Sequence, residues 1–354
     1  MSIIFTDDIK DIDRDALNAL YNSESGVYEL FENSFLTVAA LDGTDTSQTG
    51  ASPKLAGALR VLSEGVETAL LVDLRVSEGY DDRLKASLIL QAEKKLAGRR
   101  IMVFGSRENL GLFEELGYGR CKNAWTYFRA GMSESDFLPA GYRFENEFTA
   151  TAEQNVPSAG QTADRSGKNG ADIEYHNGYE NTTFEDINTI LSKAFGGRPH
   201  DVNRTKAAFS NSRYSITAYD GPKLVGVARA VSDAGDGTGY ATILNVAVDP
   251  EYQGLSIGKN MVLRLSKNIN ARVIVLNTHP GAVGFYNKLK EYRRNKYVFE
   301  KFLRPVETPD QAADSTGGRD TAGKPDAGEK KPPKGPDWAG AMFTPKGYRY
   351  PDEY

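Results

Sequence analysis

Apolar residues form two different patterns along this chain. Between residues 83 and 96 they recur every three or four positions, which predicts an amphipathic helix; the set is Leu84, Leu88, Ile89, Ala92 and Leu96. Residues 54–62 and 68–76 are instead short apolar runs separated by a polar turn, which is the pattern of a β-hairpin. The patterning therefore predicts a mixed fold of the α/β (α+β) class.

The same order of elements is expected twice. In the first part we expect strands at 3–5, 35–41, 54–62, 68–76, 100–104 and 124–128, the last of which finishes the first sheet, and helices at 16–21, 83–96 and 110–116. In the second part we expect strands from 175 and at 214–219, 223–231, 240–248, 272–277 and 297–302, and helices at 184–195, 202–209, 257–269 and 281–289.

The repeat is also visible in the letters of the sequence. The run KLAGALRVLS from Lys54 matches KLVGVARAVS from Lys223, and LVDLRVSEGY, which ends at Tyr80, lies over LNVAVDPEY, which ends at Tyr252. A repeat longer than about 100 residues indicates two similar domains, because the units of a solenoid are shorter.

Composition marks the boundaries between these domains. We expect a first domain at 1–148, a flexible linker at 149–171, a second domain at 172–304 and a disordered tail at 305–354. The tail ends in WAGAMFTPKGYRYPDEY, and aromatic residues are costly to leave in water. This end is therefore a candidate docking peptide for a protein partner or for the chain's own domains, with an ordinary chain end as the alternative.

Charge and cysteine content narrow the functional classes. The net charge of −5 gives no electrostatic footprint for nucleic acid or for an anionic membrane. Cys121 is the only cysteine, which excludes an internal disulfide and a cysteine-based metal cluster, and the three histidines lack metal-ligand spacing. No apolar run approaches the roughly 20 residues that span a bilayer. We expect a cytoplasmic protein without a bound metal.

The most informative stretch runs from Ile243 to Lys259 and reads ILNVAVDPEYQGLSIGK. An aliphatic strand stops at Asp249 and Pro250, and a loop containing small residues leads into a helix. Such a loop presents backbone N–H groups at the positive end of a helix, where a phosphate or pyrophosphate can bind. The alternative is a tight turn that holds no ligand.

This stretch resembles the GNAT superfamily of acyl-CoA-dependent N-acyltransferases. Gln253, Ile257 and Gly258 occupy positions of the family motif, whereas Ser256 stands where the first glycine is usual. The resemblance implies two tandem GNAT-like domains, each with a mixed, mostly antiparallel central sheet flanked by helices. It also implies acetyl-CoA as the acyl donor, with the pantetheine arm paired to the backbone of Val246, Ala247 and Val248. The pyrophosphate would lie on the loop formed by Gln253, Gly254, Leu255, Ser256, Ile257, Gly258 and Lys259.

Catalytic residues follow from the same resemblance. The run FYNKL from Phe285 fits a family pattern in which the tyrosine, here Tyr286, protonates the CoA sulfur; a structural tyrosine beneath the cofactor is the alternative. The strand near Asn245 carries no carboxylate, so proton removal would pass through water held by Thr242 or Asn245, or through His279. A histidine on the surface is the alternative for His279.

The first domain is expected to be a degenerate copy. Its matching loop reads YDDRLKAS, where Asp81 and Asp82 would repel a pyrophosphate, and Phe113 falls where the second copy has Tyr286.

Two functions remain open at this point. The leading interpretation is transfer of an acetyl group from acetyl-CoA to a primary amine by direct attack in the second domain. The alternative is a non-catalytic CoA-binding sensor or interaction scaffold. The amine, on a small molecule or a protein, is not identified by the sequence. Arg229 and Asp233 either meet a polar substrate or are solvated charges.

Overall fold

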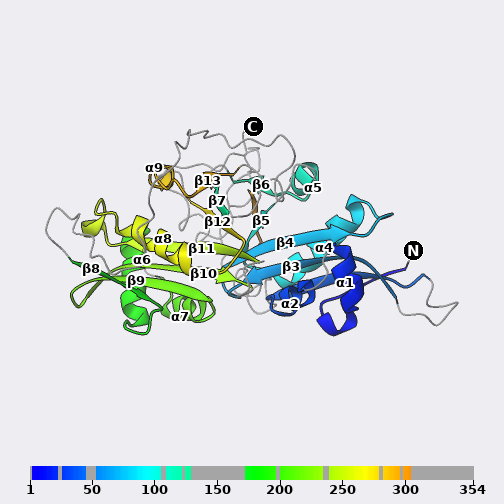
Figure 1. Ribbon diagram of the computed structural model, residues 1–354, viewed down its shortest axis with the longest axis horizontal. Helices are drawn as coiled ribbons and strands as arrows, with labels where there is room; N and C mark the ends of the chain where they lie inside the picture. Colours follow the sequence, from blue (N-terminus) through cyan, green and yellow to red (C-terminus); the bar gives the residue numbers. More distant parts are fainter. Residues whose placement is uncertain are drawn as a thin grey trace, which may run out of the picture.

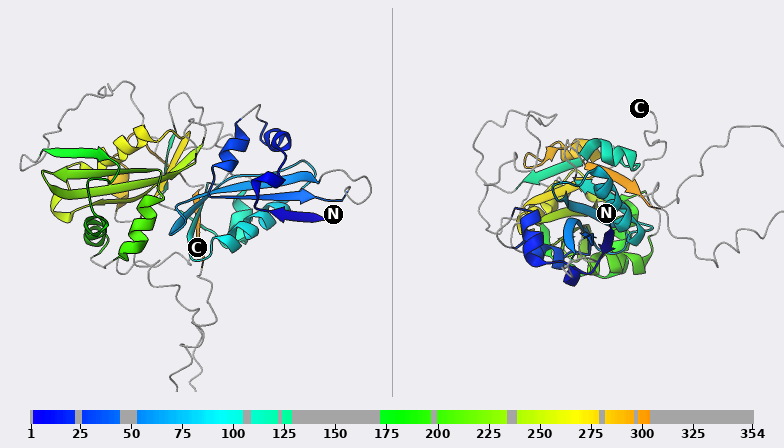
Figure 2. Two further views of the ribbon diagram at one scale, coloured as in Figure 1. Left: turned by 90° about the horizontal axis from the view of Figure 1, so that it is seen from below. Right: turned by 90° about the vertical axis from the view of Figure 1, so that its right-hand side faces the viewer.

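The computed structural model describes residues 2–22, 26–44, 53–104, 109–121, 124–128, 172–196, 200–233, 239–278, 282–295 and 298–303. The fold is mixed α/β, with two seven-stranded sheets flanked by helices. The two halves of the chain lie side by side and form one elongated molecule, with the N-terminal half at one end (Figures 1 and 2). No helix in these ranges combines the length and the apolar composition that crossing a membrane requires.

The first sheet has the strand order β1-β2-β3-β4-β5-β14-β6. Its strands are β1 (Ile3–Thr6), β2 (Leu36–Asp42), β3 (Lys54–Ser63), β4 (Thr68–Val76), β5 (Arg100–Phe104), β6 (Gly119–Arg120) and β14 (Val298–Phe302). The helices of this half are α1 (Arg14–Leu20), α2 (Val27–Glu32), α4 (Asp82–Lys95) and α5 (Leu110–Glu115), with a 3-10 turn at Ile9–Asp11. Only β4 and β5 are parallel; every other pair in the sheet is antiparallel.

The second sheet has the order β13-β7-β12-β11-β10-β9-β8. Its strands are β7 (Ala124–Phe128), β8 (Ile173–Asn177), β9 (Tyr214–Asp220), β10 (Lys223–Ser232), β11 (Tyr240–Val248), β12 (Val273–Asn277) and β13 (Arg293–Arg294). The helices are α6 (Phe184–Ala194), α7 (Val202–Ser210), α8 (Ile257–Asn268) and α9 (Val283–Tyr286), with a 3-10 turn at Pro250–Tyr252. The repeated order of elements and the predicted sheet type are therefore confirmed.

The two halves exchange one strand each. β7, from the first half, lies between β12 and β13 of the second sheet (Figure 1). β14, from the second half, lies between β5 and β6 of the first sheet. The prediction that residues 124–128 finish the first sheet is wrong. The reason is physical: an apolar pattern predicts a strand, but its backbone groups can pair equally well with either sheet. The predicted linker at 149–171 and tail at 305–354 lie outside the described residues.

Each half has one core between its sheet and its long helix and a second core under its other helices, and a fifth core joins the halves. In the second half, Met261 and Leu265 of α8 pack on the sheet, and Leu88 and Ala92 of α4 do the same in the first half. The shared core combines apolar side chains of both halves, all less than 9% exposed: Leu62, Leu70, Val72, Met102, Val231, Tyr240, Leu244 and Val273. Burial of this surface makes the two halves one packed unit.

Two arginines at matching positions of the repeat also join the halves. Arg60 binds Asp73 of its own half (Nε to Oδ2, 2.6 Å) and Asp233 of the second half. Arg229 donates to Asn245 of its own half (2.7 Å) and to Glu67 of the first half. Arg229 is 0% exposed and Asp233 is 1% exposed. The expectation that Arg229 and Asp233 are solvated charges is therefore wrong. Both are buried and bind residues of the first half.

Candidate functional site

The candidate site begins where two neighbouring strands separate. β11 and β12 are paired in parallel only from Tyr240 to Thr242 on β11. β11 continues to Val248, and on its other side it stays paired with β10 as far as Val248. The backbone of Val246 to Val248 therefore has no strand partner on the β12 side within the described residues. An extended group can add itself to such an edge through backbone hydrogen bonds.

A bulge in β11 adjoins this separation. Asn245 has a φ of 50°, in the left-handed region, and the β10–β11 register shifts between Val227 and Arg229. Asparagine and aspartate adopt this conformation more readily than most residues. Asp73 occupies the matching position on β4 with a φ of 54°, beside the equivalent register shift. The Asn245 side chain accepts from Arg229 Nε, so Arg229 fixes the bulge.

A cavity of about 60 Å³ lies at this point. It is lined by residues of β11, of the end of β12 and of α9, by Phe195 after α6, and by three residues of the first half: Ile243, Leu244, Asn245, Val246, Asn277, Thr278, Tyr286, Phe195, Glu67, Thr68 and Arg100. The structure thus brings Asn245 and Tyr286 together, as a shared site requires. His279 lies outside the described residues.

Tyr286 is buried beside the cavity. Its side chain is 6% exposed, and its ring packs edge-on against Phe285 with the centroids 4.8 Å apart. Burial raises the pKa of Tyr286 well above its ordinary value. The hydroxyl therefore stays protonated near neutral pH and can donate a hydrogen bond. The helix that carries Tyr286 is shorter than the predicted 281–289 and covers Val283–Tyr286.

The predicted phosphate loop leads from β11 into α8. Ser256 is the N-cap of α8, with a φ of 61° and no side-chain capping hydrogen bond, and Gly254 has a φ of 85°. The left-handed conformation of Ser256 explains why glycine is usual at this position of the motif. The Gln253 side chain donates to the carbonyl of Val248 (3.3 Å). Ile257 is buried in the core, so it can offer only its backbone to a ligand.

The corresponding loop of the first half is different in a way that bears on anion binding. The N-cap of α4 is Asp81, whose carboxylate accepts from the backbone N–H of Arg83 (3.0 Å). A carboxylate thus already occupies the start of α4, where α8 has no side-chain cap. Phe113, at the position matching Tyr286, is 1% exposed and has no hydroxyl to donate.

Sequence reasoning missed the residues that the first half contributes. Glu67 directly precedes β4, Thr68 is its first residue, and Arg100 starts β5. Arg100 binds Glu300 of β14, with its Nη2 2.6 Å from Oε2. No motif marks these positions, because they face the second half only after the halves pack. Phe195, the residue after α6, also lines the cavity, and no sequence motif marked it.

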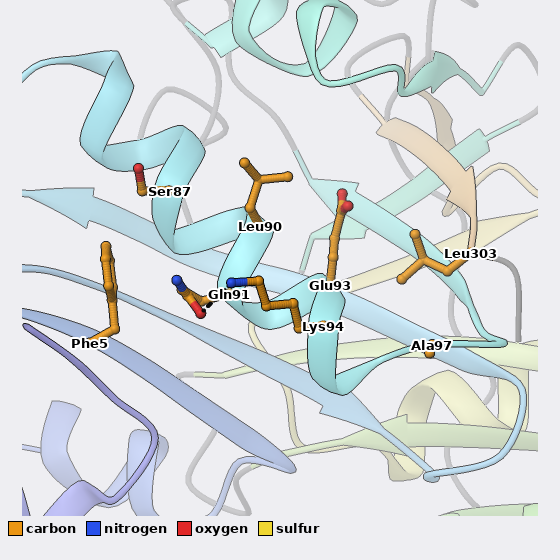
Figure 3. Close-up of a pocket in the computed structure, with 8 residues that line it drawn as sticks. All are labelled: Phe5, Ser87, Leu90, Gln91, Glu93, Lys94, Ala97 and Leu303. Carbon is orange, nitrogen blue, oxygen red and sulfur yellow. Dashed lines mark hydrogen bonds between the residues drawn. The ribbon is translucent and has the colours of Figure 1, made fainter. Parts of the chain in front are cut away.

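A larger hollow of about 480 Å³ lies on the outer face of α4, in the first half. Figure 3 shows Leu90, Gln91 and Lys94 along α4, between Phe5 and Leu303. The carboxylate of Glu93 at this hollow is already bound by Lys301 (3.0 Å) and by the Tyr118 hydroxyl (2.8 Å). The hollow does not include any of the predicted site residues. Among the described residues, no three His, Cys, Asp or Glu side chains gather as they would around a metal ion.

Comparison with known proteins finds similarity within the second half. Residues 183–290 match the model of the Acetyltransferase (GNAT) family. The chain is 34% identical over 103 residues to an uncharacterized N-acetyltransferase, ycf52-like, of Prochlorococcus marinus, covering 27% of this chain and 56% of that protein. It is 40% identical over 106 residues to the uncharacterized N-acetyltransferase ycf52 of Porphyra purpurea, covering 28% of this chain and 59% of that protein. The chain thus spans little more than half the length of these relatives.

Solved structures are similar over more of the chain at lower identity. A tandem GNAT protein from the clavulanic acid biosynthesis pathway is 14% identical, with a TM-score of 0.46, over 86% of this chain and all of that one. A GCN5-related N-acetyltransferase from Sphaerobacter thermophilus is 13% identical, with a TM-score of 0.46, over 86% of this chain and 96% of that one.

Proposed function

We propose that the second half of the chain is an acetyltransferase domain and that the protein is an N-acetyltransferase, because residues 183–290 match the model of the Acetyltransferase (GNAT) family. It transfers an acetyl group from acetyl-CoA to a primary amine by direct attack within a ternary complex, in the second half of the chain. The observation that carries this proposal is the separation of β11 from β12 next to an α8 N-terminus without a side-chain cap.

The proposed reaction assigns a part to each feature of the site. The backbone of Val246, Ala247 and Val248 pairs with the extended arm of the donor, and the residues from Gln253 to Lys259 hold its pyrophosphate. The amine nitrogen attacks the thioester carbonyl carbon, and the carbon–sulfur bond breaks. Tyr286 gives its proton to the departing sulfur, and water near Asn245 or the imidazole of His279 accepts the proton from the amine. Holding the thioester and the amine next to each other at the site supplies much of the rate enhancement.

Titration calorimetry of acetyl-CoA tests this assignment with a matched pair of variants. The Cβ of a residue at position 258 would lie in ordinary contact with Phe285, 3.4 Å away, so Gly258→Glu places a carboxylate at the phosphate loop without a backbone clash. Ala86 holds the matching position in the first half. We expect one binding site in the wild type, a loss of at least a hundredfold in affinity in Gly258→Glu, and unchanged affinity in Ala86→Glu.

The results separate the proposal from its alternatives. A loss of affinity in Ala86→Glu instead would move the donor site to the first half. Absence of binding in the wild type would overturn the proposal. If acetyl-CoA binds, release of CoA with a panel of primary amines must follow.

A non-catalytic CoA-binding sensor or scaffold is the second candidate function. It is favoured by Ser256 in place of the usual glycine and by a β11 strand without a carboxylate. Binding of acetyl-CoA without turnover of any amine in the panel would support this alternative.

A further inference from the structure

The cavity between β11 and β12 is closed by the first half of the chain. Glu67, Thr68 and Arg100 come from that half, whereas the remaining lining residues come from the second. At about 60 Å³ the cavity is far below the roughly 300–1,000 Å³ of pockets that enclose a drug-sized ligand. A cavity of this size accommodates a small group, such as one end of a substrate. If the proposed reaction takes place here, the residues of the first half lie beside that end.

Glu67 is held rigidly at this wall. Its backbone N–H donates to Glu64 Oε1 (2.7 Å), and its carbonyl accepts from the backbone N–H of Arg100 (2.9 Å). Its carboxylate accepts from Arg229 Nη2 (3.3 Å) and Arg204 Nε (3.4 Å), both from the second half. A carboxylate has about four lone-pair positions, so these two long contacts leave capacity for another donor.

The two buried arginines, Arg60 and Arg229, differ in where their carboxylate partners come from. Arg60 has one carboxylate from its own half, Asp73, and one from the other half, Asp233. At the matching position of Asp73 the second half has Asn245, which carries no charge. Both carboxylates near Arg229 therefore come from the first half: Glu64 (3.6 Å) and Glu67 (3.3 Å). Of these two, only Glu67 lines the cavity.

We propose that Glu67 binds the ammonium group of a cationic primary amine and positions it beside the separated strands, so that the first half completes the acceptor site of the second. This inference rests on the proposed acetyltransferase function and names the substrate class of the same site. Arg100 also lines the cavity, but its guanidinium is paired with Glu300 (2.6 Å). The carboxylate of Glu67 at this wall favours a positively charged group over a neutral one. The ammonium loses its proton before attack, so Glu67 serves in binding and orientation.

Glu67→Gln tests the proposal because it keeps the shape of the side chain and removes its charge. Calorimetric titration of putrescine and n-butylamine into the CoA-loaded protein measures acceptor affinity without relying on turnover. We expect at least a tenfold loss of amine affinity in Glu67→Gln, acetyl-CoA affinity within twofold of the wild type, and no change in the control Glu115→Gln, which removes an exposed carboxylate from α5.

Turnover adds a second measurement. The KM for these amines should rise at least tenfold in Glu67→Gln with a smaller change in kcat, whereas the KM for hydroxylamine, which is uncharged near neutral pH, should stay within twofold. General damage to the site would affect both kinds of acceptor. If thermal melting shows that Glu67→Gln is unfolded, Glu67→Asp decides, because it keeps the charge and withdraws it by one methylene; an unchanged amine affinity there overturns the proposal.

The outcomes for this inference and for the proposed function are distinct. Amine binding that depends on Glu67, without any turnover, would support the acceptor site and overturn the acetyltransferase function. Turnover with equal amine affinity in the wild type and Glu67→Gln would do the reverse. Absence of amine binding to the CoA-loaded wild type overturns the inference.

Discussion

Asn245 combines a backbone requirement with a place in the candidate site. Its left-handed φ of 50° produces the bulge, and its side-chain oxygen is held by Arg229. An interpretation of this residue as a holder of catalytic water must therefore include its bond to a buried arginine. At the scale of single residues, the backbone conformation and the hydrogen bond to Arg229 thus both favour asparagine at position 245.

Tyr286 gives the first prediction at this scale. If its hydroxyl protonates the departing sulfur, Tyr286→Phe should lower kcat by about 10²- to 10⁴-fold, the usual contribution of general acid catalysis, and leave acetyl-CoA affinity unchanged. Because burial raises the pKa of Tyr286 above the ordinary value of about 10, the neutral, active form persists across the assay range. The wild-type rate should therefore show no loss caused by Tyr286 between about pH 7 and pH 10. A variant with full activity would assign the tyrosine a packing role.

The site residues that sequence could predict are those within one continuous motif. Tyr286 and the loop from Gln253 to Lys259 could be proposed from the sequence because their spacing is local. Glu67 was not found, because it reaches the cavity only through packing between the halves. A sequence pattern reports the spacing of residues that are close along the chain. It carries no information on contacts between distant segments.

At the scale of elements, the repeat uses one glycine in the same way twice. Gly57 on β3 and Gly226 on β10 let the long helix of each half approach the sheet. At Gly57 an added Cβ would lie 2.9 Å from the carbonyl oxygen of Arg75, which is backbone. At Gly226 its nearest neighbour would be the end of the flexible Met261 side chain, at 3.0 Å.

This difference predicts unequal costs for the same substitution. Gly57→Ala should lower the free energy of unfolding by about 1–3 kcal/mol, as overpacking usually does, whereas Gly226→Ala should lower it by less than about 1 kcal/mol. Urea unfolding of both variants measures the two values. Equal costs, or the reverse order, would contradict this account of the two glycines.

Element types were predictable from sequence, but strand partners were not. The hairpins, the long helices and both exchanged strands follow from apolar period and turn residues. The periodicity of β7 and β14 contains no information on which sheet each strand enters. The two-residue strands β6 and β13 were also missed, because a pattern of two residues has no measurable period.

At the scale of the whole molecule, the strand exchange makes the halves interdependent. Each sheet contains a strand from the other half, and a buried core and ion pairs cross the boundary. We expect a protein cut at a protease site inserted within 149–171 to remain one particle in size-exclusion chromatography and to unfold in a single transition. Residues 172–354 expressed alone should not form the stable second domain, because β7 is missing from its sheet. Two separated, independently folded halves after cleavage would contradict this expectation.

The strand exchange also affects how the chain folds during its synthesis on the ribosome. Domains usually fold one after another as the chain emerges, with the N-terminal domain first. Here the place between β5 and β6 is filled by Val298–Phe302, which is synthesised after every other strand of either sheet. The first half therefore cannot complete its sheet while the second half is still being translated. The nascent chain must hold an unfinished sheet edge until the end of the second half arrives, and the two halves mature together.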